Sequence, residues 1–279
     1  MSPRDPLATL LRCLALETLD ADLYLGDPGP GEGRLFGGMV AAQSAIAAGL
    51  TVPADRAMHS LHAYFLRPGR HDVPIRFVVH RIRDGRSFTT RRVVAHQAGE
   101  AIFNLAASFA VPEEGIDHQD PAPQAPPPEQ CEDWEVARAR LLGGDASNFP
   151  RESAAEVRIA ETYRPNEPGP AHQMIWLRLR GTPPEDPLLH TALLVYLTDR
   201  TLASTAARPH GLPWGKRLTA SLDHAVWIHR PVRLDGRWLL YASESPAAHA
   251  ARGIIFGGIF QDGVRIASVA QEALIRVRK

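Results

Sequence analysis

Hydrophobic and polar residues alternate along four consecutive stretches in the first half of the chain. These stretches are Met58–Leu66, Val73–Arg83, Ser87–Gln97 and Ala101–Val111. Short turn sequences join them, such as Asp84-Gly85. A two-residue period with short connections is typical of an antiparallel meander that buries one face. The pattern therefore predicts an antiparallel sheet over residues 58–111.

A pattern without a polar face precedes these strands. Small and aliphatic residues fill most positions between Met39 and Leu50, which is typical of a helix that is buried all round. We predict this helix over about Gly38–Leu50, with the sheet wrapped around it. A short amphipathic helix is predicted ahead of it from the helical spacing of Leu7, Leu10, Leu11 and Leu14.

The second half of the chain repeats this plan. Residues 59–69 and 222–231 are both alternating runs that reach an Arg-Pro pair, at Arg67-Pro68 and Arg230-Pro231. The second half is predicted to hold helices over Trp134–Leu142 and Pro187–Ala206, and strands over Ala155–Thr162, Met174–Arg180, Thr219–Ile228, Trp238–Glu244, Gly253–Gln261 and Val264–Val277. A unit of about half a chain is too long for a solenoid repeat. It predicts two similar halves packed as a pseudo-dimer, with one active site at their junction.

A proline-rich segment separates the halves. Residues 112–131 contain six of the 24 prolines and almost no apolar periodicity, which favours an extended linker. The expected organisation is an N-terminal half over residues 1–111, a linker over 112–131 and a C-terminal half over 132–279.

Charge and cysteine content narrow the possible partners and compartments. Lys plus Arg and Asp plus Glu both number 31, so nothing indicates a nucleic-acid partner. Two cysteines favour a reducing compartment without a disulfide framework. The longest apolar run, Leu188–Leu197, is far shorter than a membrane span. We expect a cytoplasmic protein that does not insert into membranes.

Many short segments resemble one known family, in order along the chain. In the first half they are Phe36-Gly37-Gly38, His59–Gly69, Arg83–Phe88, Arg91–Val93 and Ala107–Phe109. In the second half they are Leu222-Asp223-His224, His229–Pro231, Glu244-Ser245, Ala251–Gly253 and Gln271-Glu272. Together they resemble acyl-CoA thioesterase II over about residues 10–120 and 185–275. The resemblance implies an α+β double hotdog fold, in which two antiparallel sheets each wrap around a central helix.

The resemblance also implies an activity and a catalytic group. Members hydrolyse fatty acyl-CoA to the free acid and CoA without a metal or redox cofactor. Their catalytic Asp, hydroxyl and Gln fall here on Asp199, Ser221 and Gln271, with Ser where the family pattern has Thr. A carboxylate in an apolar helical setting has a raised pKa, which suits a general base acting on water. Taken singly, Asp199 is typical of an exposed helix end and the other two of ordinary polar strand positions, so the joint match carries the prediction.

Two further pairs of residues are predicted to bind substrate. Gly37 and Gly38, at the start of the first buried helix, would let backbone N–H groups stabilise the thioester oxyanion, although close helix-sheet packing explains them equally well. Arg83 and Arg86 lie in an Arg-rich stretch that is predicted to contact the CoA phosphates, with a solvated strand face as the alternative.

The two halves are expected to be functionally unequal. When the second half is aligned with the first at the repeat spacing, Gln271 corresponds to Ala107, and Asp199 corresponds to a position near Phe36. Neighbouring strand residues point to opposite faces, so Asp223 and His224 cannot orient each other in a nucleophilic triad. The same alternation argues against a metal site shared by His59 and His62 in the first half.

Other functions and assemblies remain compatible with the sequence. A hotdog-fold hydratase or acyltransferase would act on the same thioesters, and a non-catalytic acyl-CoA binding protein would share the fold. Hotdog sheets present edges that can be extended, so a homodimer or larger homo-oligomer is expected.

Overall fold

The computed structural model describes residues 5–141, 153–161, 167–212 and 216–277. Its strands form one antiparallel 14-stranded sheet in the order β1-β2-β4-β5-β6-β3-β11-β14-β13-β12-β9-β8-β7, with β10 paired to β14. The first half contributes β1 (Glu17–Asp20), β2 (Leu23–Gly26), β3 (Ala57–Phe65), β4 (Ile75–Asp84), β5 (Phe88–Gln97) and β6 (Glu100–Ala110). The second half contributes β7 (Glu132–Asp133), β8 (Ala155–Ile159), β9 (His172–Leu179), β10 (Arg217–Ser221), β11 (Asp223–Ile228), β12 (Leu239–His249), β13 (Arg252–Gln261) and β14 (Val264–Val277).

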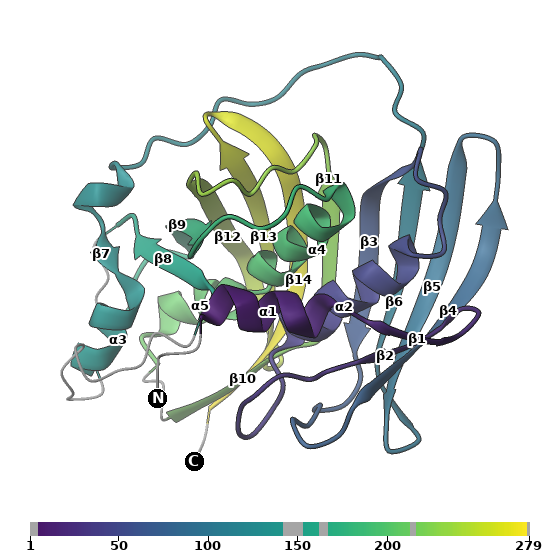
Figure 1. The fold of residues 1–279 in the computed structure, drawn as a ribbon. Coiled ribbons are helices and arrows are strands. Elements are labelled where there is room, and N and C mark those ends of the chain that lie inside the picture. Colours follow the sequence, from purple (N-terminus) through teal and green to yellow (C-terminus); the bar gives the residue numbers. More distant parts are fainter. Residues whose placement is uncertain (1–4, 142–152, 162–166, 213–215, 278–279) are drawn as a thin grey trace.

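The two halves meet edge to edge within this sheet. Strand β3 of the first half pairs with β11 of the second, with Ala63 opposite His224 and Leu61 opposite Val226 (Figure 1). The prediction of two separate sheets therefore needs correction, because the half-sheets are continuous through this strand pair. The joint brings residues of both halves next to the two buried helices.

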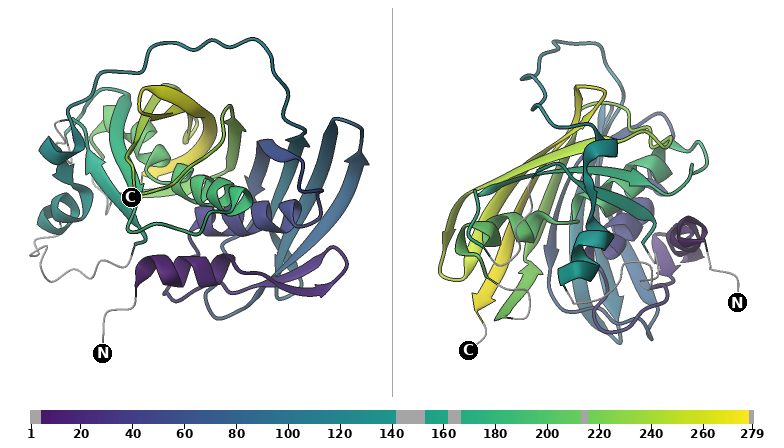
Figure 2. Two further views of the ribbon diagram at one scale, coloured as in Figure 1. Left: turned by 45° about the horizontal axis from the view of Figure 1, so that its top comes forward. Right: turned by 90° about the vertical axis from the view of Figure 1, so that its left-hand side faces the viewer.

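Helices pack against the sheet and against one another. They are α1 (Pro6–Leu14), α2 (Gly37–Gly49), α3 (Trp134–Leu141), α4 (Pro187–Thr198) and α5 (Leu202–Ala207). Helices α2 and α4 pack side by side, α2 lies against β4 to β6, and α5 lies against β12 to β14 (Figure 2). None of the helices in the described ranges is long and apolar enough to cross a bilayer.

The second buried helix is shorter than predicted. Asp186 caps its start by accepting hydrogen bonds from the backbone of Leu188 (2.8 Å) and Leu189 (3.1 Å), and Pro187 occupies its first turn. The helix ends at Thr198, and Thr201 takes a left-handed conformation (φ 67°) that an α-helix cannot accommodate. The predicted helix Pro187–Ala206 is thus two helices, and the break places Asp199 at the end of α4 instead of within a helix.

The remaining predicted elements are confirmed with small differences. The run Thr219–Ile228 is two strands, β10 and β11, that meet at Leu222. Three short strands, β1, β2 and β7, were not predicted because they have few residues and little alternation. The predicted element ends at Leu142 and Thr162 lie outside the described residues. Residues 111–127 form neither helix nor strand and arch from β6 to the far side of the second half (Figure 1).

Candidate active site

Three predicted catalytic side chains converge at the end of α4. Asp199 directly follows this helix, Ser221 ends β10, and Gln271 lies in β14, which pairs with β10. The Ser221 hydroxyl donates a hydrogen bond to Asp199 Oδ1 (3.0 Å), and Gln271 Nε2 donates to Ser221 Oγ (2.9 Å). Residues far apart in the sequence thus form one hydrogen-bonded line that ends on a carboxylate.

The N-terminus of α2 closes the other side of Asp199. The backbone N–H of Gly38 donates a hydrogen bond to the Asp199 carboxylate. A Cβ atom on Gly37 would lie 2.9 Å from Asp199 Oδ2 and 2.5 Å from the Phe65 ring. Only glycine leaves room for the carboxylate at this position. The partial positive charge of a helix N-terminus also favours a negative group here.

The Asp199 carboxyl group is poised to exchange a proton near neutral pH. Burial raises its pKa to about 7, against the opposing effects of the Ser221 hydrogen bond, the Gly38 N–H and the Arg200 charge. The residue nevertheless keeps part of its surface exposed. Arg200 itself is held by Tyr196 Oη (3.1 Å) and Ser153 Oγ (2.7 Å). A half-ionised, partly accessible carboxylate is suited to general base catalysis.

His224 extends the hydrogen-bonded line beyond the predicted residues. Its Nδ1 lies 2.7 Å from Gln271 Oε1, and its Nε2 lies 2.9 Å from Thr198 Oγ1. Burial lowers the His224 pKa to about 4, although the Gln271 hydrogen bond opposes this, so the ring is neutral at pH 7. Tyr241 donates to the Thr198 carbonyl (3.0 Å) and completes the surroundings.

The alternation of residues along the sequence predicted that Asp223 and His224 point apart, but not that His224 contacts Gln271. It separates Asp223 from His224 as predicted, and the Asp223 carboxylate accepts a hydrogen bond from the Glu272 backbone (2.6 Å). That His224 faces Gln271 depends on the register between β11 and β14, which pairs Ala225 with Ala270. Strand register across the sheet is not visible in the spacing of a single strand.

The repeat register holds for the strands but not for the helices. Ala107 lies opposite Arg91 as Gln271 lies opposite Ile255, which confirms the predicted match of Ala107 with Gln271. The predicted match of Asp199 with Phe36 is wrong. Asp199 is the residue that ends α4, and its counterpart at the end of α2 is Leu50. The added helix α5 lengthens the connection in the second half, so one constant offset cannot align both helices and strands.

The structure does not bring Arg83 and Arg86 near Asp199. Arg83 lies near the end of β4 and Arg86 in the turn that follows it, where Arg56 donates to the carbonyls of Gly85 (2.7 Å) and Arg86 (3.1 Å). This turn lies at the C-terminal end of α2, because Arg91 joins the Arg83 carbonyl to Thr51. A helix of 13 residues spans about 20 Å. The Arg83–Arg86 turn and Asp199 therefore lie at opposite ends of α2.

The two histidines of β3 are separated as predicted. His59 Nε2 lies 2.9 Å from Ser108 Oγ, whereas the His62 ring packs edge-on against Trp227 with 5.2 Å between ring centres. Within the ranges that the structure describes, no group of three His, Cys, Asp or Glu residues is placed to hold a metal ion.

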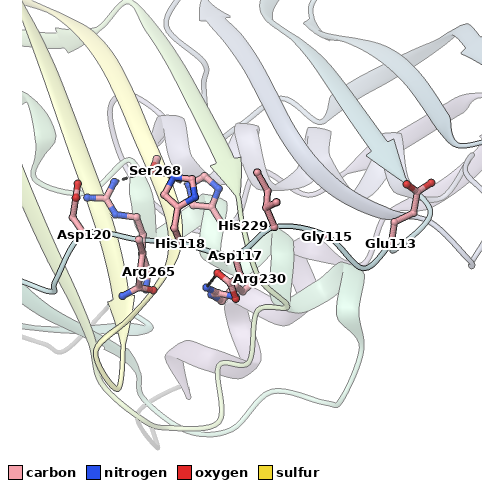
Figure 3. Close-up of a pocket in the computed structure, with 11 residues that line it drawn as sticks. Glu113, Gly115, Asp117, His118, Asp120, His229, Arg230, Arg265 and Ser268 are labelled. Carbon is pink, nitrogen blue, oxygen red and sulfur yellow. Dashed lines mark hydrogen bonds and ion pairs between the residues drawn. The ribbon is translucent and has the colours of Figure 1, made fainter.

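A separate cavity lies under the linker. Its volume is about 710 Å³, and it is lined by linker residues 113 and 115–120, by His229 and Arg230 directly after β11, and by Arg265 and Ser268 of β14. Asp117 accepts hydrogen bonds from two nitrogens of the Arg230 guanidinium (Figure 3). Gln119 donates to the Gly263 carbonyl and accepts from the Arg265 backbone N–H. None of the predicted catalytic residues lines this cavity. These contacts fasten the linker to the second half.

Comparison with solved structures identifies the α+β architecture as a hotdog fold. A protein with a hot dog fold from Alicyclobacillus acidocaldarius aligns with a TM-score of 0.80 over 97% of this chain and 98% of its own, at 20% identity. Acyl-CoA thioesterase II TesB2 from Mycobacterium marinum aligns with a TM-score of 0.81 at 38% identity, over 97% and 98% of the two chains.

Sequence comparison gives the family. Residues 26–110 match the acyl-CoA thioesterase N-terminal domain, and residues 145–274 match the acyl-CoA thioesterase family. Acyl-CoA thioesterase 2 of Haemophilus influenzae is 38% identical over 282 residues, which cover 98% of each chain. The chain belongs to the acyl-CoA thioesterase II family, as its sequence segments predicted.

Proposed function

We propose that this protein hydrolyses fatty acyl-CoA to the fatty acid and CoA by means of a water molecule activated by Asp199. Its family makes it an acyl-CoA thioester hydrolase. The catalytic assignment rests on one observation. The line of hydrogen bonds from Gln271 through Ser221 ends on a carboxylate whose pKa burial raises to about 7.

The chemistry follows from the donors and acceptors of this line. Ionised Asp199 takes a proton from water as the water oxygen attacks the thioester carbonyl carbon. The tetrahedral intermediate collapses with cleavage of the carbon-sulfur bond, the water oxygen and its remaining proton stay in the fatty acid, and the protonated Asp199 returns its proton to the departing CoA sulfur. Ser221 and Gln271 hold the carboxylate and the water in place, which lowers the entropic cost of reaching the transition state.

Helix α2 supplies the electrophilic side of the site. We assign stabilisation of the oxyanion to the backbone at Gly37 and Gly38, where N–H groups at a helix N-terminus point toward developing negative charge. The Gly38 N–H also contacts Asp199. Substrate and carboxylate would therefore share the same small region of backbone donors.

Release of free thiol separates the candidate activities. Hydrolysis releases CoA thiol at a rate that matches formation of free fatty acid, whereas a hydratase keeps the thioester intact. An acyltransferase releases thiol only when an acceptor is present, and a binding protein releases none. Assays over a series of acyl chain lengths, with Asp199→Asn as the matched inactive control, test the assignment. Acid formation by Asp199→Asn at the unaltered rate would exclude Asp199 as the base.

A single-turnover experiment in ¹⁸O-labelled water tests the role of water. Direct attack by water places one ¹⁸O atom in the fatty acid during the first turnover. Attack by the Asp199 carboxylate would instead form an anhydride, and water that opens this anhydride at the Asp199 carbonyl carbon would leave the label in the protein. Label in Asp199 after one turnover would overturn the general-base assignment but leave the hydrolase activity in place.

We also propose the organisation within which this site works. Residues 1–111 and 132–279 would form the two halves of a double hotdog, joined by the linker 112–131, with each half-sheet wrapped around its own helix. Cys13 and Cys131 are unpaired and buried, which supports a cytoplasmic protein. Extendable sheet edges support a homodimer or larger homo-oligomer. Sedimentation equilibrium tests the assembly, and a monomer at micromolar concentration would contradict it.

A further inference from the structure

The hydrogen-bonded line forms a closed loop at the end of α4. It runs from Asp199 to Ser221, Gln271 and His224, and returns to Thr198, the residue before Asp199. Three of its members, Gln271, His224 and Thr198, have at most 1% of their surface exposed. Water is thus largely excluded from the inner part of the loop, and each group must satisfy its neighbour.

A neutral imidazole gives this loop a direction, because one ring nitrogen donates and the other accepts. In one direction, His224 Nδ1 donates to Gln271 Oε1, Gln271 Nε2 donates to Ser221, and Ser221 donates to Asp199. The Thr198 hydroxyl then donates to His224 Nε2. This direction ends with a donor pointing at Asp199, which is what an ionised carboxylate requires.

The same atoms also accommodate the reverse direction. A protonated Asp199 donates to Ser221, Ser221 donates to the reoriented Gln271 amide, and the amide donates to His224 Nδ1. His224 Nε2 then donates to Thr198, whose hydroxyl donates to the Val195 carbonyl 2.9 Å away. Both directions satisfy every member, so the direction of the loop follows the protonation state of the carboxyl group.

We propose that His224 is a positioning residue for thioester hydrolysis, whose Nδ1–H tautomer holds Gln271 and Ser221 as donors toward the ionised Asp199. This inference rests on the proposed role of Asp199 as the base. His224 does not touch the reacting atoms and acts only through Gln271 and Ser221.

The first half of the molecule shows that the fold does not need a histidine here. The strand pair β3 and β6 places Leu61 opposite Ala107, where the second half has His224 beside Gln271. Both Leu61 and Ala107 are fully buried apolar residues. Buried polar groups cost free energy unless they are fully hydrogen-bonded, so an apolar pair is the simpler solution. A buried His-Gln pair in the equivalent position therefore indicates a requirement beyond packing.

Among the residues that the structure describes, few other titratable groups face Asp199. Arg200 follows it in the chain and lowers its pKa, and Tyr241 of β12 has its own pKa raised partly by the Asp199 charge. Helix α2 contributes only the backbone of Gly37 and Gly38. His224 of β11 is the remaining ionisable neighbour in the loop, so its tautomer is the feature that a substitution can change without altering a nearby charge.

Two substitutions at His224 separate the two ring nitrogens. The side-chain nitrogen of Asn occupies the place of Nδ1, whereas that of Gln reaches the place of Nε2. His224→Asn retains a donor to Gln271 and is expected to keep the acid limb of the kcat/KM profile near its original pH. His224→Gln and His224→Leu remove that donor. Their acid limb is expected to move up by about one pH unit, because a hydrogen bond that favours the carboxylate is lost.

Melting temperatures and the spectra of the histidine rings distinguish a positioning role of His224 from a role in packing alone. ¹⁵N spectra of the histidine rings are expected to show His224 with Nδ1–H above pH 7 and Nε2–H below it. The change should disappear in Asp199→Asn, whose side chain does not titrate. A role limited to packing predicts that the acid limb stays fixed in all three His224 variants while their melting temperatures fall. That result, or a ring with Nε2–H at every pH, would overturn the inference.

These experiments also separate a failure of the proposal for His224 from a failure of the proposed function. If Asp199→Asn remains active, the general-base assignment fails, whatever the ring spectra show. If Asp199→Asn is inactive and the His224 variants keep the original acid limb, only the role of His224 fails. Thr198→Val serves as a control, because it removes the hydroxyl that pairs with Nε2 in both directions of the loop without changing the side-chain volume much. It is expected to leave the acid limb closer to its original pH than His224→Leu does, and an equal shift in both variants would count against the role of Nδ1.

Discussion

The ends of the two buried helices occupy equivalent places in the two halves and are built in opposite ways. Helix α4 ends at Asp199, whose carboxyl group meets Ser221 and the N-terminus of α2. Helix α2 ends at Leu50, and the next residue, Thr51, is held by the Arg91 guanidinium through its hydroxyl (2.8 Å) and its carbonyl (3.0 Å).

Arg91 makes the α2 end rigid and chemically inert. It is 1% exposed and also bonds to the carbonyls of Arg83 and Thr90 and to the Asp84 carboxylate. A permanently charged guanidinium satisfies the carbonyls of a helix end without any group that exchanges a proton near pH 7. The duplicated fold thus provides the same position twice: a carboxyl group, Asp199, ends α4 at a cost in stability, whereas the α2 end is held by a buried guanidinium.

Removing the acid at the α4 end is expected to have the largest effect. Asp199→Asn keeps the shape of the side chain but cannot accept a proton from water, so kcat should fall by roughly 10²- to 10⁴-fold. In the unmodified enzyme, kcat/KM should fall as the pH drops through about 7, because protonated Asp199 is inactive. Steady-state kinetics from pH 5 to 9 measure both effects. A profile that is flat across pH 7 would contradict the assignment.

Removing the Arg91 guanidinium at the α2 end should instead lower the stability of the fold and leave the catalytic rate unchanged. Arg91→Met leaves several buried carbonyls without a donor and is expected to lower the free energy of unfolding by about 3 kcal/mol. Arg92→Met is the matched control, since the neighbouring Arg92 is exposed. Urea denaturation measures the difference, and kcat per folded molecule should stay unchanged. An equally large loss of kcat in Arg91→Met would show that the α2 end participates in catalysis.

The contrast between the helix ends marks what the sequence could and could not reveal. All-round apolar runs predicted both helices, and alternation predicted most strands, because these patterns depend on local burial. The break after Thr198 depends on the conformation of Thr201 and had no such signal. The resemblance located Asp199, Ser221 and Gln271, but the part played by His224 required the register between β11 and β14. Contacts across a sheet are set by tertiary packing, which residue spacing does not encode.

Removing the Ser221 hydroxyl or the Gln271 amide at the α4 end should lower kcat by an intermediate amount. Ser221→Ala and Gln271→Ala each remove two hydrogen bonds of this line and are expected to lower kcat about tenfold. Ser221→Thr retains the hydroxyl and serves as the matched control, with activity closer to the original. Either alanine substitution should add little to Asp199→Asn, because the three groups act on the same water. Fully multiplicative losses in the double variants would indicate independent roles.

The Asp199 carboxyl group at the end of α4 should also lower the stability of the folded state at high pH. Burial raises the Asp199 pKa from its ordinary value of 3.8 to about 7, so the folded state holds the proton more tightly than the unfolded state. The associated stability is present below pH 3.8 and is lost as the pH rises through 7. Asp199→Asn should therefore raise the melting temperature at pH 8 by a few degrees, and by less at pH 5. Calorimetry at both pH values checks the sign, and a lower melting temperature at pH 8 would refute it.

The smallest effect is expected from the exposed arginines beside the α2 end. Arg83 and Arg86 are the proposed contacts for the CoA phosphates, yet they lie about 20 Å from Asp199 along α2. Exposed ion pairs contribute little, so Arg83→Glu with Arg86→Glu should raise KM about threefold at low ionic strength and leave kcat unchanged. The increase should vanish at high salt, where such contacts are screened. A KM that does not change at low salt would place the phosphates elsewhere and restrict substrate binding to the α4 end.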